Sequence, residues 1–209
     1  MILGVDHLAL TVTDMTVGQQ SLEKEGFVCQ FAENNQPNAI EKKRFLGHYQ
    51  PYHDLALFRP KEGGVAVEIT NHGPVVASGR GPYQYYQDHI VLHTPDPQVE
   101  QAFWQEALRF RKSGEPNLLK LISPVPDWSC RLKLVLDDTI EPCTLDSAGY
   151  PCLALLSNKL DQDSQKIAKA GASAFTEPFS LVVNGKRLEI VLFRTPTGAL
   201  GELIQVKGK

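Results

Sequence analysis

The stretch Asp6-His7-Leu8-Ala9-Leu10 reappears later in the chain as Asp88-His89-Ile90-Val91-Leu92. In both copies an acid and a histidine open a short apolar run of the kind that forms a buried strand. Both copies then lead through an acidic turn into a segment with helical spacing, residues 16–25 and residues 97–110. An internal repeat indicates that one structural unit occurs more than once, so this pair decides the fold we expect.

A third, more diverged copy begins at Tyr150. A strand is predicted over residues 151–156 and a helix over residues 161–170, which Gly171 ends. Asn184-Gly185 is a strong hairpin signal between two of the strand candidates that follow. The same order of strand, helix and three strands is predicted for every copy. We therefore predict an α+β fold made of three βαβββ units with mainly antiparallel sheets.

The units are predicted to span residues 1–75 (unit one), residues 84–146 (unit two) and residues 147–209 (unit three). Residues 76–83, in a neighbourhood rich in glycine and proline, are the predicted linker between units one and two.

Composition excludes several classes of protein. Lys and Arg number 21 against 24 Asp and Glu, and the net charge of −3 gives no electrostatic reason to expect nucleic acid or an anionic membrane as partner. No apolar run approaches the roughly 20 residues that cross a bilayer, and the first residues lack the pattern of a signal peptide. The 4 cysteines are scattered, which favours reduced thiols over a disulfide framework. We therefore expect a cytoplasmic protein.

The repeated units resemble those of the vicinal oxygen chelate superfamily, which includes glyoxalase I, the bleomycin-resistance proteins and the extradiol dioxygenases. The resemblance is carried by Asp88-His89-Ile90, by Phe103-Trp104-Gln105 and above all by the closing segment, residues 193–205. That segment is similar to the family's ending of phenylalanine, arginine, aspartate-proline, glycine and then glutamate-leucine. Thr195 and Thr197 stand where the family usually has acids.

The resemblance implies that units work in pairs whose sheets curl around a cleft. Residues 84–209 look like one paired domain, so we expect units two and three to close around one cleft. Unit one, residues 1–75, looks like an additional single unit. Its unpaired sheet would expose an apolar face, so we expect it to pair with its copy in a homodimer or to fold onto residues 84–209.

The resemblance also implies metal ligands on the first strand of a unit, usually His, and on the last strand, usually Glu. Unit one offers His7 and Glu68, and unit two offers His89 but no acid on its last strand. Unit three offers Cys152 in place of His, together with Glu202. Glu68 and Glu202 are also the candidate catalytic carboxylates, because an acid within an apolar strand is costly unless it is paired or ligated.

Two ligand sets remain open. His89, Cys152 and Glu202 from units two and three would suit Zn²⁺, whereas His7, His89 and Glu68 from units one and two would suit Fe²⁺ or Mn²⁺. Cys152 can equally be a small buried apolar residue.

Three further side chains, those of His53, Asp6 and Asp88, lie near the candidate ligands in the sequence pattern. His53, which opens an apolar strand, can face the cleft or lie at a strand edge. Asp6 and Asp88 are expected to point to the opposite sheet face from the histidines that follow them, because side chains alternate along a strand.

Two functions fit this pattern. The first is a metal-dependent enzyme of the glyoxalase or dioxygenase type, which acts on a small oxygenated metabolite by Lewis-acid stabilisation of an enolate-type intermediate or by oxygen activation. The alternative is a metal-free small-molecule-binding protein of the bleomycin-resistance type. His7, His89, Glu68 and Glu202 favour the enzyme, whereas Cys152 and the missing acid of unit two favour the binding protein.

Overall fold

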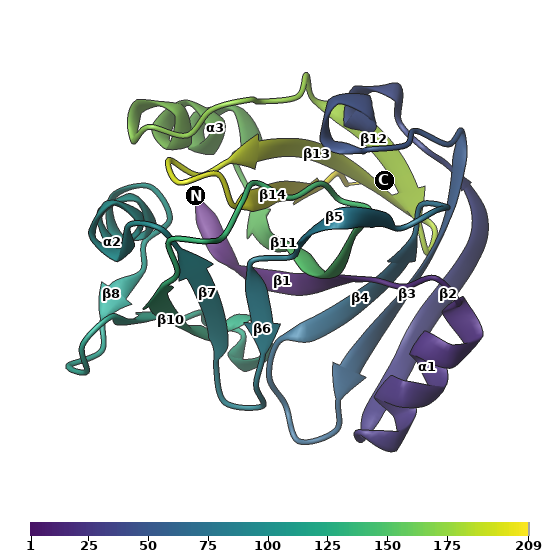
Figure 1. Cartoon of the computed structure of the whole chain (residues 1–209), viewed down its shortest axis with the longest axis horizontal. Coiled ribbons are helices and arrows are strands. Elements are labelled where there is room, and N and C mark those ends of the chain that lie inside the picture. Colours follow the sequence, from purple (N-terminus) through teal and green to yellow (C-terminus); the bar gives the residue numbers. More distant parts are fainter. Residues whose placement is uncertain (209) are drawn as a thin grey trace.

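The computed structural model describes residues 1–208, without the side chains of residues 76–79. Within that range three α-helices lie around a sheet that mixes parallel and antiparallel strands (Figure 1). The α+β class predicted from the sequence is confirmed. No helix among the described residues is long and apolar enough to cross a membrane.

Unit one contains β1 (Ile2–Thr11), α1 (Met15–Lys24), β2 (Phe27–Pro37), the 3-10 helix η1 (Ile40–Phe45), β3 (Tyr52–Pro60) and β4 (Ala66–Asn71). Asp14 begins α1, because its carboxylate accepts a hydrogen bond from the backbone N–H of Val17 at 3.1 Å. Gly26 follows the helix with φ of 88°, a left-handed conformation that glycine adopts without strain.

Unit two contains β7 (Ile90–Thr94), α2 (Pro97–Glu106), β8 (Arg111–Lys112), β9 (Leu118–Leu121), the 3-10 helix η2 (Pro126–Trp128) and β10 (Cys130–Leu136). Unit three contains β11 (Ser147–Ser157), α3 (Leu160–Lys169), β12 (Phe179–Val183), β13 (Lys186–Arg194) and β14 (Leu200–Val206). The Asn184-Gly185 turn joins β12 to β13 in an antiparallel hairpin, as the sequence predicts.

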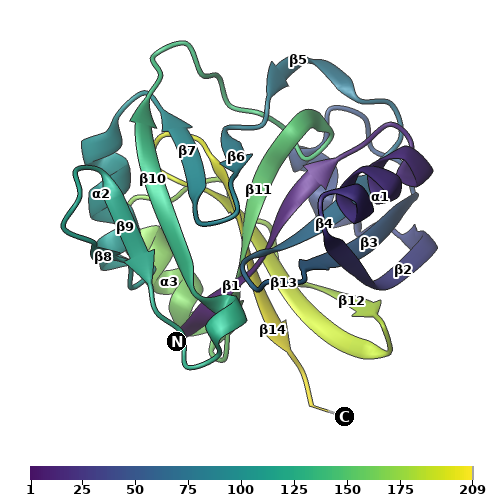
Figure 2. The same ribbon diagram turned by 90° about the horizontal axis from the view of Figure 1, so that it is seen from below.

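The pairing of units differs from the sequence-based expectation. β1 pairs antiparallel with β11, so that units one and three form one curved sheet in the order β2-β3-β4-β1-β11-β14-β13-β12. Figure 2 shows β1 and β11 side by side in the middle of the molecule, with β7, β10 and α2 on one side and β2, β3, β4 and α1 on the other. Units two and three therefore do not close around a cleft of their own.

The reason lies in the predicted linker. It forms β5 (Val76–Arg80) and ends at the first residue of β6 (Tyr83–Tyr85), and β6 pairs with the edge of β7 that would otherwise be open to another unit. The backbone N–H of Gly81 donates to the carbonyl of Ala148 at 2.8 Å. A Cβ atom on Gly81 would lie 2.1 Å from the backbone of Tyr150, so this close approach requires glycine.

The paired sheet gives unit one a partner within the chain. Of the two outcomes expected for unit one, the structure has the fold-back onto residues 84–209. Unit one therefore no longer gives a reason to expect a homodimer, because its sheet is already paired within the chain. The homodimer itself stays a prediction.

The core lies mainly on the convex face of the sheet. Ile2, Val5 and Leu8 of β1 pack there with Leu153 and Leu155 of β11. The largest buried side chains of α2 join the same cluster, and Ile167 of α3 is also part of it. Because side chains alternate along each strand, the opposite face carries a second cluster of buried apolar residues, which includes Ala9 and Ala154, and also lines a cavity.

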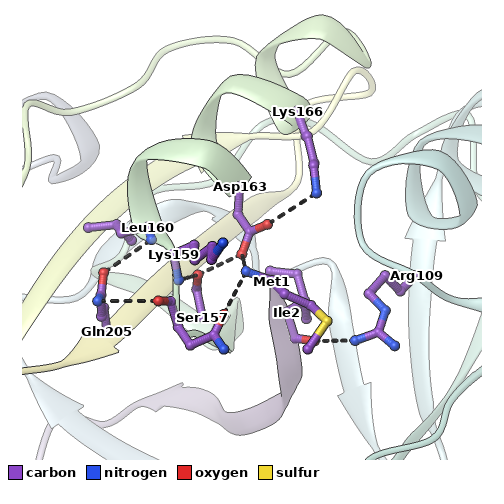
Figure 3. A network of polar contacts seen from close by, with 10 residues as sticks. Met1, Ile2, Arg109, Ser157, Lys159, Leu160, Asp163, Lys166 and Gln205 are labelled. Atoms are coloured by element: carbon purple, nitrogen blue, oxygen red, sulfur yellow. Dashed lines mark hydrogen bonds and ion pairs between the residues drawn. The ribbon is translucent and has the colours of Figure 1, made fainter.

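The first residues of β1 connect all three units (Figure 3). The nitrogen of Met1 lies 2.7 Å from Asp163 Oδ2 on α3, and that buried carboxylate also accepts a hydrogen bond from Ser157 Oγ at 2.6 Å. Arg109 of unit two donates to the carbonyl of Ile2 at 2.7 Å. These contacts fix the start of β1 between α3 and unit two.

The two threonines that depart from the family pattern have a structural role. Glu100 of α2 is fully buried, and its carboxylate accepts from Trp104 Nε1 at 2.6 Å and from the hydroxyls of Thr195 and Thr197. Burial raises the pKa of Glu100, against these hydrogen bonds, which lower it. The carboxylate of this hydrogen-bonded group thus comes from α2, and the turn that contains Thr195 and Thr197 supplies two of its donors.

We predict that Thr195→Val lowers the free energy of unfolding by about 1–3 kcal/mol, because one donor to a buried carboxylate is lost without a change in shape. Urea denaturation measures the effect. Thr16→Val makes the same atomic change at an exposed position of α1 and is expected to stay within about 0.5 kcal/mol of wild type. Equal effects of the two variants would contradict the role assigned to Thr195.

Candidate functional site

A cavity of about 590 Å³ lies against the concave face of the sheet formed by units one and three. Alternate residues of each strand face it, as in β3, which contributes His53, Leu55, Leu57 and Arg59. Its volume falls in the range typical of small-molecule sites. The lining is largely apolar, with a small set of charged and polar side chains.

Strand register gathers three predicted site residues on this face. His7 is opposite Ala154 of β11, and Ala154 is in turn opposite Glu202 of β14. Glu68 of β4 is opposite Ala9, which points to the same side as His7. His7, Glu68 and Glu202 all line the cavity. The structure thus brings together ligand candidates from units one and three, whereas each of the two ligand sets predicted for a pair of units included His89 of unit two.

His7 has one nitrogen engaged and one nitrogen free. Its Nδ1 lies 2.8 Å from Asp6 Oδ2, and its Nε2 lies 3.6 Å from Glu68 Oε1. The imidazole is only 3% exposed, and Nε2 has no hydrogen-bond partner within residues 1–208. A buried ring nitrogen without a partner is uncommon, and here it lies beside a carboxylate in a cavity.

The orientation expected for Asp6 is wrong. The pairing of β1 with β11 shifts register between Val5 and His7, and such a bulge lets consecutive residues present side chains on one side. Asp6 consequently lines the cavity and contacts His7. Asp88 likewise contacts the histidine that follows it, at 2.7 Å. Asp6 is therefore positioned to fix the tautomer and ring orientation of His7.

Electrostatics keeps His7 charged. Burial disfavours the imidazolium, but the carboxylates of Glu68, Asp6 and Glu202 outweigh burial and raise the pKa of His7 from 6.5 to about 9. Glu202 shows the opposite balance. Its pKa is raised because burial outweighs the opposing effects of His7 and Lys42, and the negative charge of Glu68 adds to the rise.

Cys152 occupies the place in unit three that His7 occupies in unit one. Glu68 is opposite the residue two positions after His7, and Glu202 is opposite the residue two positions after Cys152. The Cys152 side chain is fully buried, packs among apolar residues and is not part of the cavity lining. Burial raises the pKa of its thiol well above the ordinary value, so the thiol is protonated at neutral pH.

His89 is not among the residues that line the cavity. It precedes β7, stacks on Tyr86 with ring centroids 4.9 Å apart and contacts Asp88. The structure therefore does not bring His89 together with His7, Glu68 or Glu202, although the sequence repeat makes it equivalent to His7. β6 pairs with the edge of β7, the short strand that follows His89. This pairing keeps His89 away from the position that His7 has beside the cavity.

His7, Glu68 and Glu202 are the kinds of side chain that bind a divalent cation, but in this structure they do not surround one common point. One imidazole and two carboxylates are ligands that suit Zn²⁺, Mn²⁺ and Fe²⁺. No group of three His, Cys, Asp or Glu side chains within residues 1–208 is close enough to hold a metal ion. His7 and Glu68 are close together, so a third ligand from Glu202 requires its side chain to turn toward them. Repulsion between the two carboxylates opposes this turn in the absence of a cation.

Sequence reasoning missed several cavity residues. Lys42 comes from η1, inside a loop rich in Asn, Gln and Pro that carried no functional signal. His72 follows β4, and Arg59 closes β3. The alternation from His53 to Arg59 was a usable signal for a cavity-facing set, because it places charged and apolar side chains on one face.

Comparisons with known proteins give distant structural likenesses. No family model and no curated protein matches the chain. Glyoxalase I from Zea mays is 15% identical over 97% of this chain and 67% of its own, with a TM-score of 0.42. Methylmalonyl-CoA epimerase from Mycobacterium tuberculosis is 12% identical over 99% of this chain and 90% of its own, with a TM-score of 0.46.

A glyoxalase/bleomycin resistance protein from Albidiferax ferrireducens is 13% identical over 56% of this chain and 97% of its own, with a TM-score of 0.44. Glyoxalase I and the bleomycin-resistance proteins are also members of the superfamily that the sequence resembles. Each likeness is too distant to carry an inference about the activity of this chain.

We predict that the His7 imidazole of the metal-free protein titrates with a midpoint of about 9 in NMR spectra. Because the folded-state pKa lies above the ordinary value, His7 contributes stability that is complete below pH 6.5 and is lost as pH rises through about 9. Glu68→Gln is expected to lower the midpoint, whereas Glu62→Gln, at an exposed position, is expected to leave it unchanged. A midpoint near 6.5 in wild type would contradict the electrostatics described here.

Proposed function

We propose that the chain is a glyoxalase- or dioxygenase-like metal-dependent enzyme that acts on a small oxygenated metabolite. The observation that supports this most is the unpartnered Nε2 of His7, buried at the cavity wall 3.6 Å from a carboxylate oxygen of Glu68. Such an atom gains a partner when a cation or a ligand enters. Glu202, on the same face, is the third donor.

In this proposal His7, Glu68 and Glu202 hold the cation, and Asp6 holds the ring of His7 in position. A divalent cation would supply Lewis acidity to oxygen atoms of the bound metabolite. Binding requires neutral His7, so the proton that the three carboxylates favour on the imidazole must leave. Affinity for the cation is therefore expected to rise with pH.

The carboxylates also provide the proton-transfer group. Glu202 is partly buried, and its pKa is raised toward neutral pH, where a carboxylate accepts and returns a proton more effectively. Glu68 lies nearer to His7 and is the firmer candidate for a ligand. We therefore assign Glu68 to holding the cation, and we assign Glu202 the proton-transfer role in addition to its place as third ligand.

The test is calorimetric titration of Mn²⁺ and Zn²⁺ into chelator-treated protein. Wild type is expected to bind one ion per chain, and His7→Ala, Glu68→Gln and Glu202→Gln are each expected to lose binding. Asp6→Asn, which changes only a supporting partner, is expected to weaken affinity by about 10–100-fold. His89→Ala is the matched control, because that histidine lies outside the cavity, and it is expected to bind like wild type.

The second candidate is a metal-free small-molecule-binding protein of the bleomycin-resistance type. It is favoured by the absence, within residues 1–208, of three donors gathered around one point, and by the protonated, buried thiol of Cys152 where a histidine would complete the set. If wild type binds neither ion, this candidate replaces the enzyme. If binding persists in His7→Ala and Glu68→Gln but fails in His89→Ala, the cation lies in unit two.

A further inference from the structure

One end of the cavity is lined by three nitrogen-bearing side chains that have few partners in the protein. Lys42 is 8% exposed, and His53 and His72 are each 3% exposed. None of them belongs to the His7, Glu68 and Glu202 set. Buried donors without acceptors are costly, so this end of the cavity is built for a group that the protein itself does not supply.

The two histidines form a fixed pair. His53 opens β3 and His72 follows β4, at positions next to the paired residues Asp54 and Asn71. Their rings stack with centroids 5.0 Å apart and an interplanar angle of 19°. The Nδ1 atom of each ring is buried and has no hydrogen-bond partner within residues 1–208.

Both imidazoles are neutral at pH 7. Burial, with a further contribution from the Lys42 charge, lowers the pKa of His53 to about 3, against a hydrogen bond to the backbone of Gln36 that raises it, and burial holds the pKa of His72 well below its ordinary value. A neutral imidazole has one nitrogen that donates and one that accepts. His53 already has a backbone partner in Gln36, so His72 is the ring that offers an N–H to a ligand, and the pair adds no positive charge.

Lys42 supplies the charge. It makes no ion pair with any described residue, and its Nζ lies 5.8 Å from the centre of the Phe179 ring. An ammonium group that is mostly buried needs a counter-ion or hydrogen-bond acceptors to offset its lost hydration. The aromatic ring compensates only part of this loss.

Arg59, another cation of the cavity, also has a buried nitrogen without a hydrogen-bond partner within residues 1–208. Arg59 and Lys186 lie near Asp6 and help to hold the pKa of that carboxyl below its ordinary value, although its burial acts in the opposite direction. Lys42 in the same way opposes the rise in the pKa of Glu202, but it forms no ion pair with that carboxylate. What distinguishes the Lys42 end of the cavity is that its ammonium group acts on two stacked, neutral imidazoles and has no directly paired acid among the described residues.

We propose that Lys42, His53 and His72 form the subsite for the carboxylate of an organic ligand whose apolar body lies along the cavity wall. Leu55, Leu188 and Ile190 line that wall. The single positive charge of Lys42 matches the single negative charge of a carboxylate. A phosphate dianion would leave one negative charge unmatched in a cavity that already holds Glu68 and Glu202. The proposal rests on the proposed function only in requiring that the cavity takes a small organic molecule.

The experiment compares hexanoate, hexanamide and hexyl phosphate as probes of chelator-treated protein, so that no bound metal can attract the anion. Affinities are measured by NMR titration, with the imidazole resonances of His53 and His72 as local reporters. Hexanoate is expected to bind at least about tenfold more tightly than hexanamide and to shift both imidazoles. Hexyl phosphate is expected to bind more weakly than hexanoate.

Lys42→Met keeps the apolar stem and removes the charge. It is expected to abolish the preference for hexanoate while hexanamide binds as in wild type, which also shows that the cavity is intact. His53→Phe and His72→Phe keep a stacked ring and are expected to reduce the preference partly. Lys186→Met, which removes a cation at the exposed rim of the same cavity, is the matched control and is expected to retain the preference.

Several results would overturn the subsite. They are equal binding of hexanoate and hexanamide, no binding of either probe, tighter binding of hexyl phosphate, or a preference lost in Lys186→Met but kept in Lys42→Met. These results are separable from a failure of the metal proposal. Hexanoate binding that depends on Lys42 in a protein that binds no cation would support the subsite and refute the metal-dependent enzyme. Cation binding without a preference for hexanoate would support the metal-dependent enzyme and refute the carboxylate subsite.

Discussion

The antiparallel pairing of β1 with β11 determines the rest of the structure. It joins units one and three into one sheet and sets which side chains face the core and which face the cavity. Because side chains alternate along a strand, a slip of one residue would exchange the two sets. Leu8 would then leave the core, and His7 would lose its place beside Glu68. Contacts of Met1 and Ile2 with α3 and with Arg109 hold the register at the start of β1.

The buried charges around His7 are an expensive arrangement. Asp6, His7, Glu68 and Glu202 all give up hydration, and replacing such groups by apolar residues often stabilises a protein. Their mutual interactions move the pKa of His7 up to about 9 and cannot fully prevent the rise in the pKa of Glu202. Charged groups held in a cavity at this cost are typical of functional sites, where a ligand or an ion restores the balance. The larger core cluster, which includes Leu8, Leu153 and Leu155, lies on the other face of the same strands and does not contain these charged groups.

Much of this arrangement could be predicted from the sequence, and the failures have definite causes. The order of helices and strands follows from local patterns and from the repeat, and the choice of His7, Glu68 and Glu202 as site residues follows from what the family resemblance implies. The partner of unit one did not, because β6 arises from a glycine- and proline-rich segment and covers the edge of β7. The place of Asp6 depends on a bulge, which alternation alone cannot show. Lys42 reaches the cavity from an irregular loop, where no periodicity marks the direction of a side chain.

The two ends of the cavity interact electrostatically. Lys42 is among the groups that counteract the rise in the pKa of Glu202. A carboxylate bound at Lys42 would offset that effect, because its negative charge cancels the field of the ammonium group at Glu202. Glu202 would then become a stronger base when the ligand is bound. The ligand's own anion would thus adjust the group proposed to move its proton, which gives a physical reason for one cavity to contain both an anion subsite and a buried carboxylate.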